Sequence, residues 1–297
     1  MPNYNIKREA EIFVVSGTGR FPISVKEVSF GQTFKENSYT KKTINNQTNY
    51  FEGSTINQAN AANFDFSVSV LAQDDYNILH TLLLGPTSFD LYIDTSTDIF
   101  KLESAVITNA VFIINKAQPL SLQIQGEASR LHRGASLTGT LQTGTAQESK
   151  TFISPSITVT LDGGSTLSDI VSISMELQND ISWIPYATLQ DSLSVTNYSN
   201  SMFPSGFYVN KKTLSGSIQQ YLTDSNTSNT LSWDTDVTLS IKAGSGAGAS
   251  FRGFHLDAAS CSFTNRISTG QLFMQSYDWR MIESPTSLGT KLKYTTD

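Results

Sequence analysis

The sequence predicts an all-β protein, mainly antiparallel, made of two tandem β-sandwich or half-barrel domains with at most one short helix each. The first observation is the stretch at residues 63–71, Asn-Phe-Asp-Phe-Ser-Val-Ser-Val-Leu, where polar and apolar side chains alternate as in a strand with one solvated face. The second is a similar stretch, residues 213–221, that follows 150 positions later. The third is composition, because 38% of residues are hydrophobic and only 15% are charged, which suits strands with polar but weakly charged faces.

The similarity between the two halves extends along most of the chain. At the offset of 150, the matches are Phe64 with Leu214, Val68 with Ile218, residues 110–116 with 260–266, and Gln125 with Gln275. Near the start of each half the offset is 145, and the matches are Ile12 with Ile157, Val28 with Ile173, and Phe30 with Met175. The two offsets imply a five-residue insertion in the second half, and insertions belong in loops. We therefore divide the chain into a first repeat (1–136), a linker rich in Gly, Thr and Ser (137–153) and a second repeat (154–297).

One helix is predicted, over residues 74–84, directly after the alternating stretch. Asp74 and Asp75 lie in its first turn, apolar residues recur at helical spacing, and Gly85-Pro86 ends it. We expect it to be the longest helix of the chain and to cover one side of the sheet. The corresponding stretch of the second half, residues 223–233, is rich in Ser and Asn and lacks an apolar face, so a helix there should be short or absent.

Two long polar segments, residues 33–60 and 178–210, interrupt the strands and carry many aromatic side chains. A loop of this length without structure of its own is uncommon in a compact domain, which favours a projecting hairpin or arm. We expect these aromatics to find no partner within their own domain and to contact neighbouring copies of the chain. The candidates for this role are Phe34, Tyr39, Tyr50, Phe51, Trp183, Tyr186, Tyr198, Phe203 and Tyr208.

No catalytic or metal-binding pattern is found, so we expect neither an enzyme nor a cofactor. The glycine-rich residues 244–248 lack the Lys-Ser/Thr of a phosphate-binding loop, and the three histidines, His80, His132 and His255, are scattered along the sequence. Cys261 is interpreted as a buried structural thiol. The net charge of −6 leaves no basic patch for gripping nucleic acid, and no apolar run approaches a membrane span of ~20 residues, so we expect no membrane contact.

The order of these elements resembles the tail tube proteins of tailed bacteriophages, most closely the non-contractile, long-tail type with two tandem tube domains in one chain. The likeness is carried by Ile12-Phe13-Val14, by Val28-Ser29-Phe30-Gly31-Gln32, by residues 63–71 with the helix that follows, and by residues 213–222. The resemblance implies trimeric, pseudo-hexameric rings that stack into a tube and channel double-stranded DNA into the host.

The same resemblance implies a set of partners and a location. The partners would be other copies of the chain, a tape-measure protein and double-stranded DNA in the lumen, and tail terminator and tail-tip proteins at the two ends of the tube. The protein would belong to the virion, as part of the phage tail, and would be assembled in the cytoplasm of the bacterial host.

In such a tube, a polar and weakly acidic strand face would line the lumen, where it would let DNA slide instead of binding it. The candidates lie at alternating positions: Asp65, Ser67, Ser69, Ser121, Gln123, Gln125, Glu127, Thr213, Ser215, Ser217 and Gln219. The plainer interpretation is that they form the solvated face of an ordinary sandwich. Two other functions stay open: the tube protein of a contractile injection system, and a carbohydrate-binding β-sandwich module of the tail tip, in which Tyr and Trp residues would contact sugars.

Overall fold

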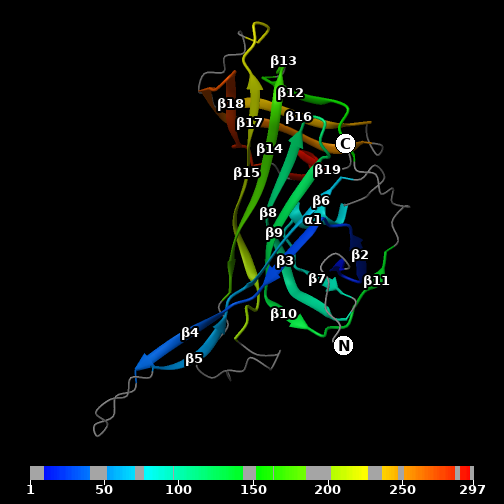
Figure 1. Ribbon diagram of the computed structural model, residues 1–297, viewed down its shortest axis with the longest axis vertical. Helices are drawn as coiled ribbons and strands as arrows, with labels where there is room; N and C mark the ends of the chain where they lie inside the picture. The colour runs from blue at the N-terminus through cyan, green and yellow to red at the C-terminus, as the bar shows by residue number, and fades with distance from the viewer. Residues whose placement is uncertain are drawn as a thin grey trace.

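The computed structural model shows an elongated β structure in which long strands run along the body of the molecule (Figure 1). It describes residues 10–40, 52–70, 77–95, 97–142, 152–162, 164–184, 202–226, 236–246, 251–284 and 288–294. The strands of the first half are β1 (Glu11–Ser16), β2 (Gly19–Ile23), β3 (Glu27–Gly31), β4 (Phe34–Thr40), β5 (Glu52–Ala59), β6 (Ala62–Ser69), β7 (Phe89–Asp94), β8 (Ile99–Asn115), β9 (Ser121–Ala128), β10 (Arg130–Arg133) and β11 (Thr140–Leu141).

The second half contributes β12 (Ile157–Leu161), β13 (Ser165–Thr166), β14 (Ile170–Trp183), β15 (Phe207–Tyr221), β16 (Val237–Ser245), β17 (Arg252–Thr269), β18 (Phe273–Met281) and β19 (Leu292–Tyr294). Among these strands every pairing is antiparallel except that of β2 with β11, which is parallel. The predicted class, all-β and mainly antiparallel, is therefore confirmed. The boundaries of the two repeats and of the linker stay a prediction, and residues 143–151 of the linker lie outside the described residues.

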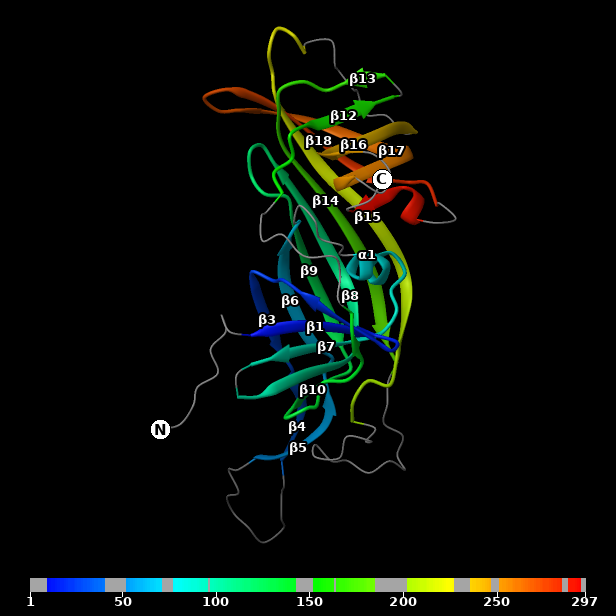
Figure 2. The ribbon, with the colours of Figure 1, turned by 90° about the vertical axis from the view of Figure 1, so that its right-hand side faces the viewer.

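The largest unit is a sheet in which eight strands follow one another in the order β3, β6, β9, β8, β14, β15, β18, β17. The first four strands come from the first half and the last four from the second. In each group the chain visits the first, second, fourth and third position in turn, so both halves connect their strands in the same way. The pairing of β8 with β14 joins the two groups into one continuous sheet, and Figure 2 shows these long strands side by side.

Each half adds a smaller layer to this sheet. In the first half, β1 pairs with β2 and β7, and β7 and β10 pair with the beginning of β8. In the second half, β12 pairs with β13 and β16, and β16 and β19 pair with the beginning of β17. The long strands β8 and β17 therefore belong to both layers of their half, and each half folds back onto its own part of the large sheet.

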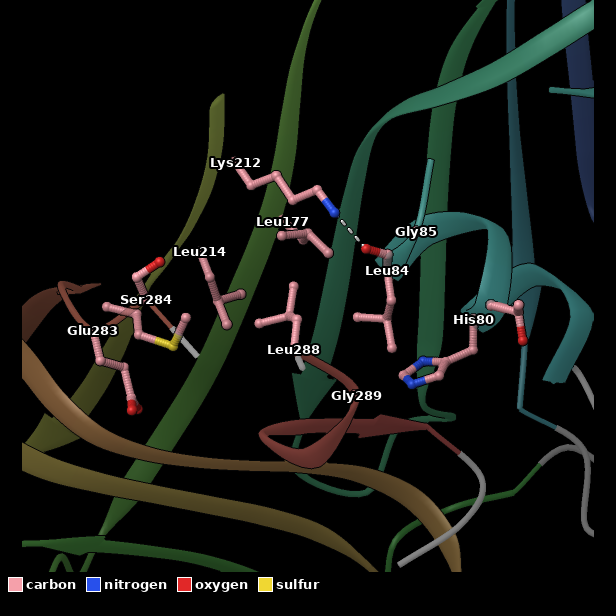
Figure 3. Close-up of a pocket in the computed structure, with 12 residues that line it drawn as sticks. His80, Leu84, Gly85, Leu177, Lys212, Leu214, Glu283, Ser284, Leu288 and Gly289 are labelled. Atoms are coloured by element: carbon pink, nitrogen blue, oxygen red, sulfur yellow. Dashed lines mark hydrogen bonds between the residues drawn. The ribbon is translucent and has the colours of Figure 1, made fainter. Parts of the chain in front are cut away.

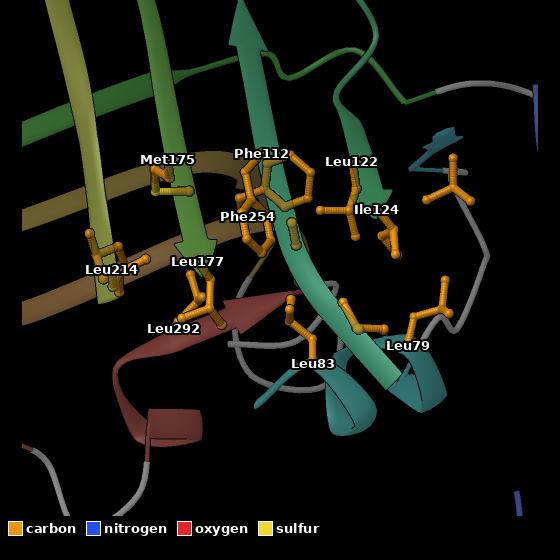
Figure 4. Packing of buried hydrophobic residues seen from close by; sticks show 14 of the residues in the cluster. Leu79, Leu83, Phe112, Leu122, Ile124, Met175, Leu177, Leu214, Phe254 and Leu292 are labelled. Atoms are coloured by element: carbon orange, nitrogen blue, oxygen red, sulfur yellow. The ribbon is translucent and has the colours of Figure 1, made fainter. Parts of the chain in front are cut away.

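The helix α1 (Asn77–Leu84) covers the junction of the two halves, as Figure 4 shows. Leu79 and Leu83 are fully buried there, close to Phe112 of β8 and Leu177 of β14. Full burial of such a side chain contributes about 1.5–3 kcal/mol. The ring of Phe112 also meets Phe254 of β17 edge to face, with ring centroids 5.1 Å apart. One apolar core therefore extends across both halves of the chain.

A buried polar side chain fastens α1 to this junction. The amide of Asn179 in β14 donates one hydrogen bond to the Leu83 carbonyl and one to the Ile107 carbonyl, each 3.1 Å long. These bonds satisfy a carbonyl at the end of the helix, where the last turn has no intrahelical donors. The predicted helix is confirmed over residues 77–84, and its first residues lie outside the described part of the chain. Apart from α1, the described residues form one helical turn, a 3₁₀-helix at Leu288–Thr290.

The proposed offset of 150 is consistent for β6 and β15 but wrong for the two pairs of strands that follow. In β8 the buried side chains include Phe112 and Ile114, whereas Ser262 and Thr264, 150 positions later in β17, are not buried. Because successive side chains of a strand point to opposite faces, only an odd offset matches buried with buried. A bulge provides the extra residue, since the pairing of β8 with β9 shifts by one between Ile107 and Asn109, whereas β17 and β18 pair without a shift.

Candidate functional site: a polar face across eight strands

All the candidates for the lumen lie on one face of the eight-stranded sheet, but Ser69 is buried and so is not available to a lumen in the single chain. Residues that pair across neighbouring strands point to the same side, so the register decides which side chains share a face. Asp65 pairs with Gln125, which pairs with Asn109, and the row continues to Gln178 and Thr213. The structure thereby brings the candidates of β6, β9 and β15 together, although about 80 residues of sequence separate the last two strands.

A second row shows how far this face extends. It crosses all eight strands and consists of Glu27, Ser67, Gln123, Val111, Glu176, Ser215, Arg280 and Ser262. The opposite side of the same strands carries the buried residues of the core, such as Phe66, Ile124 and Leu177. The alternation seen in the sequence therefore separates a polar wall from an apolar core over the whole width of the sheet.

Several polar side chains of this face bond to one another. The hydroxyl groups of Ser174 and Ser217 lie 3.1 Å apart, and the hydroxyl of Ser172 donates to the side-chain oxygen of Gln219 over 3.2 Å. At the other end of the sheet the indole N–H of Trp183 donates to Glu127 over 2.6 Å. Side chains that bond within the wall offer fewer free groups to a passing molecule.

Charges on the face are mixed, with carboxylates in excess. The acidic residues on it are Glu27, Asp65, Glu127, Glu176, Asp180 and Asp278, and the basic ones are Lys211, Arg266 and Arg280. The second half therefore places basic residues on a face that was expected to be polar and weakly acidic. One of the arginines is already paired, because Arg266 forms an ion pair with Asp278 at 3.1 Å. The remaining field is weakly acidic.

The sequence analysis missed the contributions of five strands to this face. β3 adds Glu27, β8 adds Asn109, β17 and β18 add polar residues such as Thr264 and Ser276, and β14 adds alternate residues from Ser172 to Gln178. The signal for β14 was present, since Ser-Ile-Ser-Met-Glu-Leu-Gln at residues 172–178 alternates strictly. In β8 it was weaker, because Val111 and Ile113 are apolar on the polar side.

The aromatic arm residues have mixed surroundings. Tyr208 is 57% exposed and Phe34 is 41% exposed, as expected for contacts with another copy. The expectation that the arm aromatics find no partner within their own domain is wrong for Trp183, which meets Phe207 edge to face at 5.6 Å. Phe203 is buried beneath the guanidinium of Arg130 at 5.0 Å, so its partner belongs to the first repeat of the same chain and not to a neighbouring copy. The side chain of Tyr39 and residues Tyr50, Phe51, Tyr186 and Tyr198 lie outside the described part.

The first arm projects from the body, and the described end of the second arm contacts the first half of the chain. β4 and β5 form a separate two-stranded hairpin that extends away from the body, as both views show (Figures 1 and 2). The end of the second arm returns to the first half, where Ala59 donates its N–H to the Met202 carbonyl over 2.9 Å and Ser129 bonds to the Pro204 carbonyl. The second arm is thus already docked on a neighbouring domain, which in this case belongs to the same chain.

A hollow of about 710 Å³ lies on the core side of the sheet, beside α1 (Figure 3). Leu177, Leu214 and Leu288 form much of its lining, and the ammonium of Lys212 donates to the Leu84 carbonyl over 2.6 Å. Burial lowers the pKa of His80, at the edge of the hollow, to about 4, against a smaller opposing effect of the backbone of Leu292. These groups are spread around an apolar hollow and do not form the paired acid and base of a catalytic site.

Two further searches of the described residues bear on partners. No group of three or more His, Cys, Asp or Glu side chains is placed to hold a metal ion in this part of the chain. Of the helices that the structure describes, none has the length and apolar character needed to cross a membrane.

The described residues thus form a wide polar sheet backed by an apolar core, with a projecting hairpin. Residues 71–295 match the model of the bacteriophage baseplate tube protein family, and the chain belongs to that family. This confirms the coarser part of the expectation: the protein is a tube-like structural component of a phage tail or baseplate, and so of the virion.

Comparison with solved structures gives a distant likeness. One chain of a cryo-EM structure of the anti-feeding prophage (AFP) baseplate is 10% identical, with a TM-score of 0.37 over 45% of this chain and 97% of that chain. No curated protein matches the sequence.

Proposed function

We propose that three copies of this chain close into a ring, that the rings stack into a tube, and that the polar face lines the bore through which double-stranded DNA enters the host. In this proposal the two groups of four strands are copies of one tube domain, so three chains form a pseudo-hexameric ring. The role is mechanical: the protein is a building block and a conduit, and not an enzyme.

The observation that carries the proposal is the continuous eight-stranded sheet with its single polar face. Three such sheets give a barrel of about 24 strands, beyond the 16–18 that already leave an aqueous channel. With strands about 4.8 Å apart, the backbone wall of this barrel is about 37 Å across before strand tilt widens it further. A bore of this size has room for a DNA duplex after side chains are added.

The chemistry of the face supports passage of DNA and not its capture. Binding to DNA gains most of its affinity from basic side chains that displace counterions from the phosphates. Here the carboxylates outnumber the basic groups, and Arg266 is held by Asp278. Hydroxyl and amide groups, several of them bonded to each other, make up much of the rest. Such a wall repels phosphate weakly and holds it at no fixed point.

Membership of the baseplate tube family supports a position for this protein in the baseplate segment of the tube. In a tube, each ring contacts a ring above and a ring below, and the lumen holds the molecules that pass through it. Rings above and below are copies of this chain or other tube proteins, the lumen holds a tape-measure protein before DNA, and terminator and tip proteins close the ends. Assembly takes place in the bacterial cytoplasm. A long non-contractile tail and a contractile injection system remain the two settings to be compared, and they differ in whether a sheath surrounds the tube.

The carbohydrate-binding alternative finds less support in the described residues. Sugar platforms are exposed aromatic rings that cluster on one surface. Trp279 is buried and Trp183 is bonded to Glu127, while the exposed Tyr208 and Tyr221 lie at opposite ends of β15. The Tyr and Trp side chains named here therefore share no exposed surface of that kind.

Electron microscopy of the purified protein, together with sedimentation velocity, tests the proposal. We expect particles with the mass of three chains, ring-shaped views with pseudo-sixfold symmetry and short stacks at higher concentration. A protein that stays monomeric at every concentration would contradict the proposed ring. Binding to a glycan array by such a monomer would favour the carbohydrate-binding function instead.

A further inference from the structure

We propose that the outer edge of β17 pairs with β3 of a second copy of this chain, in the register that joins β8 to β14 within one chain. The inference rests on the proposed ring and identifies its joint. Residues 109–113 of β8 have partners on both sides, in β9 and β14. In the described residues, the end of β17 pairs only with β18, and β3 pairs only with β6. The eight-stranded sheet therefore ends in two edges whose backbone N–H and C=O groups can pair with another strand.

The ladders of the two halves give the correspondence between β3 and β14. Phe66 of β6 corresponds to Gly216 of β15. The matched residues on either side, Phe64 with Leu214 and Val68 with Ile218, are all buried in the core. Phe66 pairs with Val28, and Gly216 pairs with Met175. Val28 therefore corresponds to Met175. The sequence analysis had matched Val28 with Ile173, which lies two residues away on the same face of β14.

The same reasoning gives the correspondence between β8 and β17. Phe66 pairs on its other side with Ile124, and Gly216 pairs with Trp279. Ile124 pairs in turn with Ala110 of β8, and Trp279 pairs with Phe263 of β17. Ala110 therefore corresponds to Phe263, and both side chains are buried on the core side of their strands.

The pairing of β8 with β14, the internal joint, now predicts each residue pair of the external joint between β17 and β3 of a second copy. Within the chain, Ala110 pairs with Leu177, and Leu177 corresponds to Phe30 because both pair with matched residues of β6 and β15. Phe263 should therefore lie opposite Phe30 of the second copy. The full joint places residues 262–268 opposite residues 25–31, antiparallel, with as many paired residues as the internal joint has.

The chemistry of the two edges agrees with this register. Ile113 pairs with Ser174 inside the chain, and the corresponding residues are Arg266 and Glu27. Both are exposed, with 71% of the Arg266 side chain accessible, and both point to the polar face. Directly opposed opposite charges stabilise a strand pair. A slip of two residues would place Arg266 opposite Ser29 or Val25 and lose this pairing.

The two edges are different surfaces at opposite ends of one sheet, so the contact runs head to tail. Such heterologous contacts form rings when the rotation between copies closes and filaments when it does not. A ring results if each contact between copies repeats the arrangement of β8 and β14 within the chain. Internal and external strand pairs then alternate around the ring.

Disulfide trapping tests the register directly. Ser29 and Thr264 both point to the polar face and correspond to the internal pair Glu176 and Val111. The double variant Ser29→Cys, Thr264→Cys should form covalent dimers and closed trimers under mild oxidation, read on non-reducing gels. The native thiol should not interfere, because burial, and the charge of Glu283, raise the pKa of Cys261 to about 12.

Two matched controls place the second cysteine two residues before or after Thr264, on the same face of β17. They are Ser29→Cys with Ser262→Cys, and Ser29→Cys with Arg266→Cys. We expect at least fivefold less cross-linking in both. Rings seen by electron microscopy without cross-linking at Thr264 would overturn the proposed joint while leaving the ring intact, and stronger cross-linking in a control would overturn its register. Absence of any oligomer would contradict the proposed function, and the joint with it.

A charge exchange gives a second measurement that does not depend on oxidation. Glu27→Lys should weaken association roughly two- to fivefold per joint, since like charges directly opposite destabilise a strand pair. Adding Arg266→Glu to the same chain should restore most of the association. Glu11→Lys, an exposed change on β1, is the control and should leave the trimer unchanged. An Arg266→Glu change that fails to rescue Glu27→Lys would contradict the proposed pairing.

Discussion

Replacing Gly216 by alanine should disrupt the sheet at the centre of β15. A methyl group at this position would lie 2.1 Å from the Ser174 carbonyl oxygen and 2.8 Å from the ring of Trp279. Ordinary contacts of such a group begin at 3.4 Å, so β14 and the indole would each have to move. The carbonyl belongs to the backbone of a strand that pairs with β15 along most of its length, and it cannot move without breaking hydrogen bonds nearby.

The expected cost follows from these two displacements. Overpacking in a dense core costs about 1–3 kcal/mol. Each hydrogen bond lost beside the clash adds roughly 1 kcal/mol. A total of about 3–5 kcal/mol corresponds to a fall in Tm of roughly 6–20 °C for a chain of this size.

Thermal unfolding followed by circular dichroism, at a concentration where the protein is monomeric, measures this effect. Gly206→Ala is the matched control, because the nearest atom to its added methyl group is 3.5 Å away. That variant should unfold at or slightly above the wild-type temperature, since alanine restricts the unfolded chain.

A further variant separates the two clashes. Trp279→Leu in the Gly216→Ala background removes the indole but leaves the Ser174 carbonyl in place, so it should not restore stability. Equal unfolding temperatures for Gly216→Ala and Gly206→Ala would refute the reasoning. Full rescue by Trp279→Leu would show that the backbone contact is not the one that matters.

Three other predictions concern pH, the lumen and the arms. His80→Gln should make the protein less sensitive to acid between about pH 6.5 and 4. Because burial lowers the pKa of His80 in the folded state, the unfolded chain binds the proton more readily, and the free energy of unfolding falls as the pH drops below 6.5. Denaturant titrations at several pH values should show a smaller fall in the variant. Changing Asp65, Gln123 and Glu127 together to lysine should let assembled tubes retain duplex DNA in a salt-dependent filter assay, whereas the corresponding change to serine should not, and equal retention by both would argue against a lumenal position. Deleting residues 40–55 should leave a folded protein that no longer forms tubes in electron microscopy, and tubes made by the deletion variant would show that the first arm is not a joint.

The sequence alone determined which faces of β6, β9 and β15 are polar. Alternation at residues 63–71 and 213–221 depends only on the fact that neighbouring side chains of an extended backbone point to opposite sides. It is therefore visible wherever the strand is regular, and the position of α1 was visible for a similar local reason, its helical spacing and the Gly85-Pro86 stop. These local patterns are sufficient to predict an all-β chain with a polar wall and an apolar core.

The tertiary structure decided what the polar faces belong to. Pairing between β8 and β14 turns two groups of strands into one sheet, and no local pattern indicates it, because hydrogen bonds between backbones are nearly independent of side-chain identity. The bulge at residues 107–109 was also invisible to local patterns. Its one extra residue reverses which side chains of β8 face the core, while the composition of the strand stays the same. The burial of Phe203 under Arg130 likewise required two distant segments to meet. The local order of side chains determines the two faces of a regular strand. Which strand pairs with which depends on contacts between distant segments, and these exist only in the folded chain.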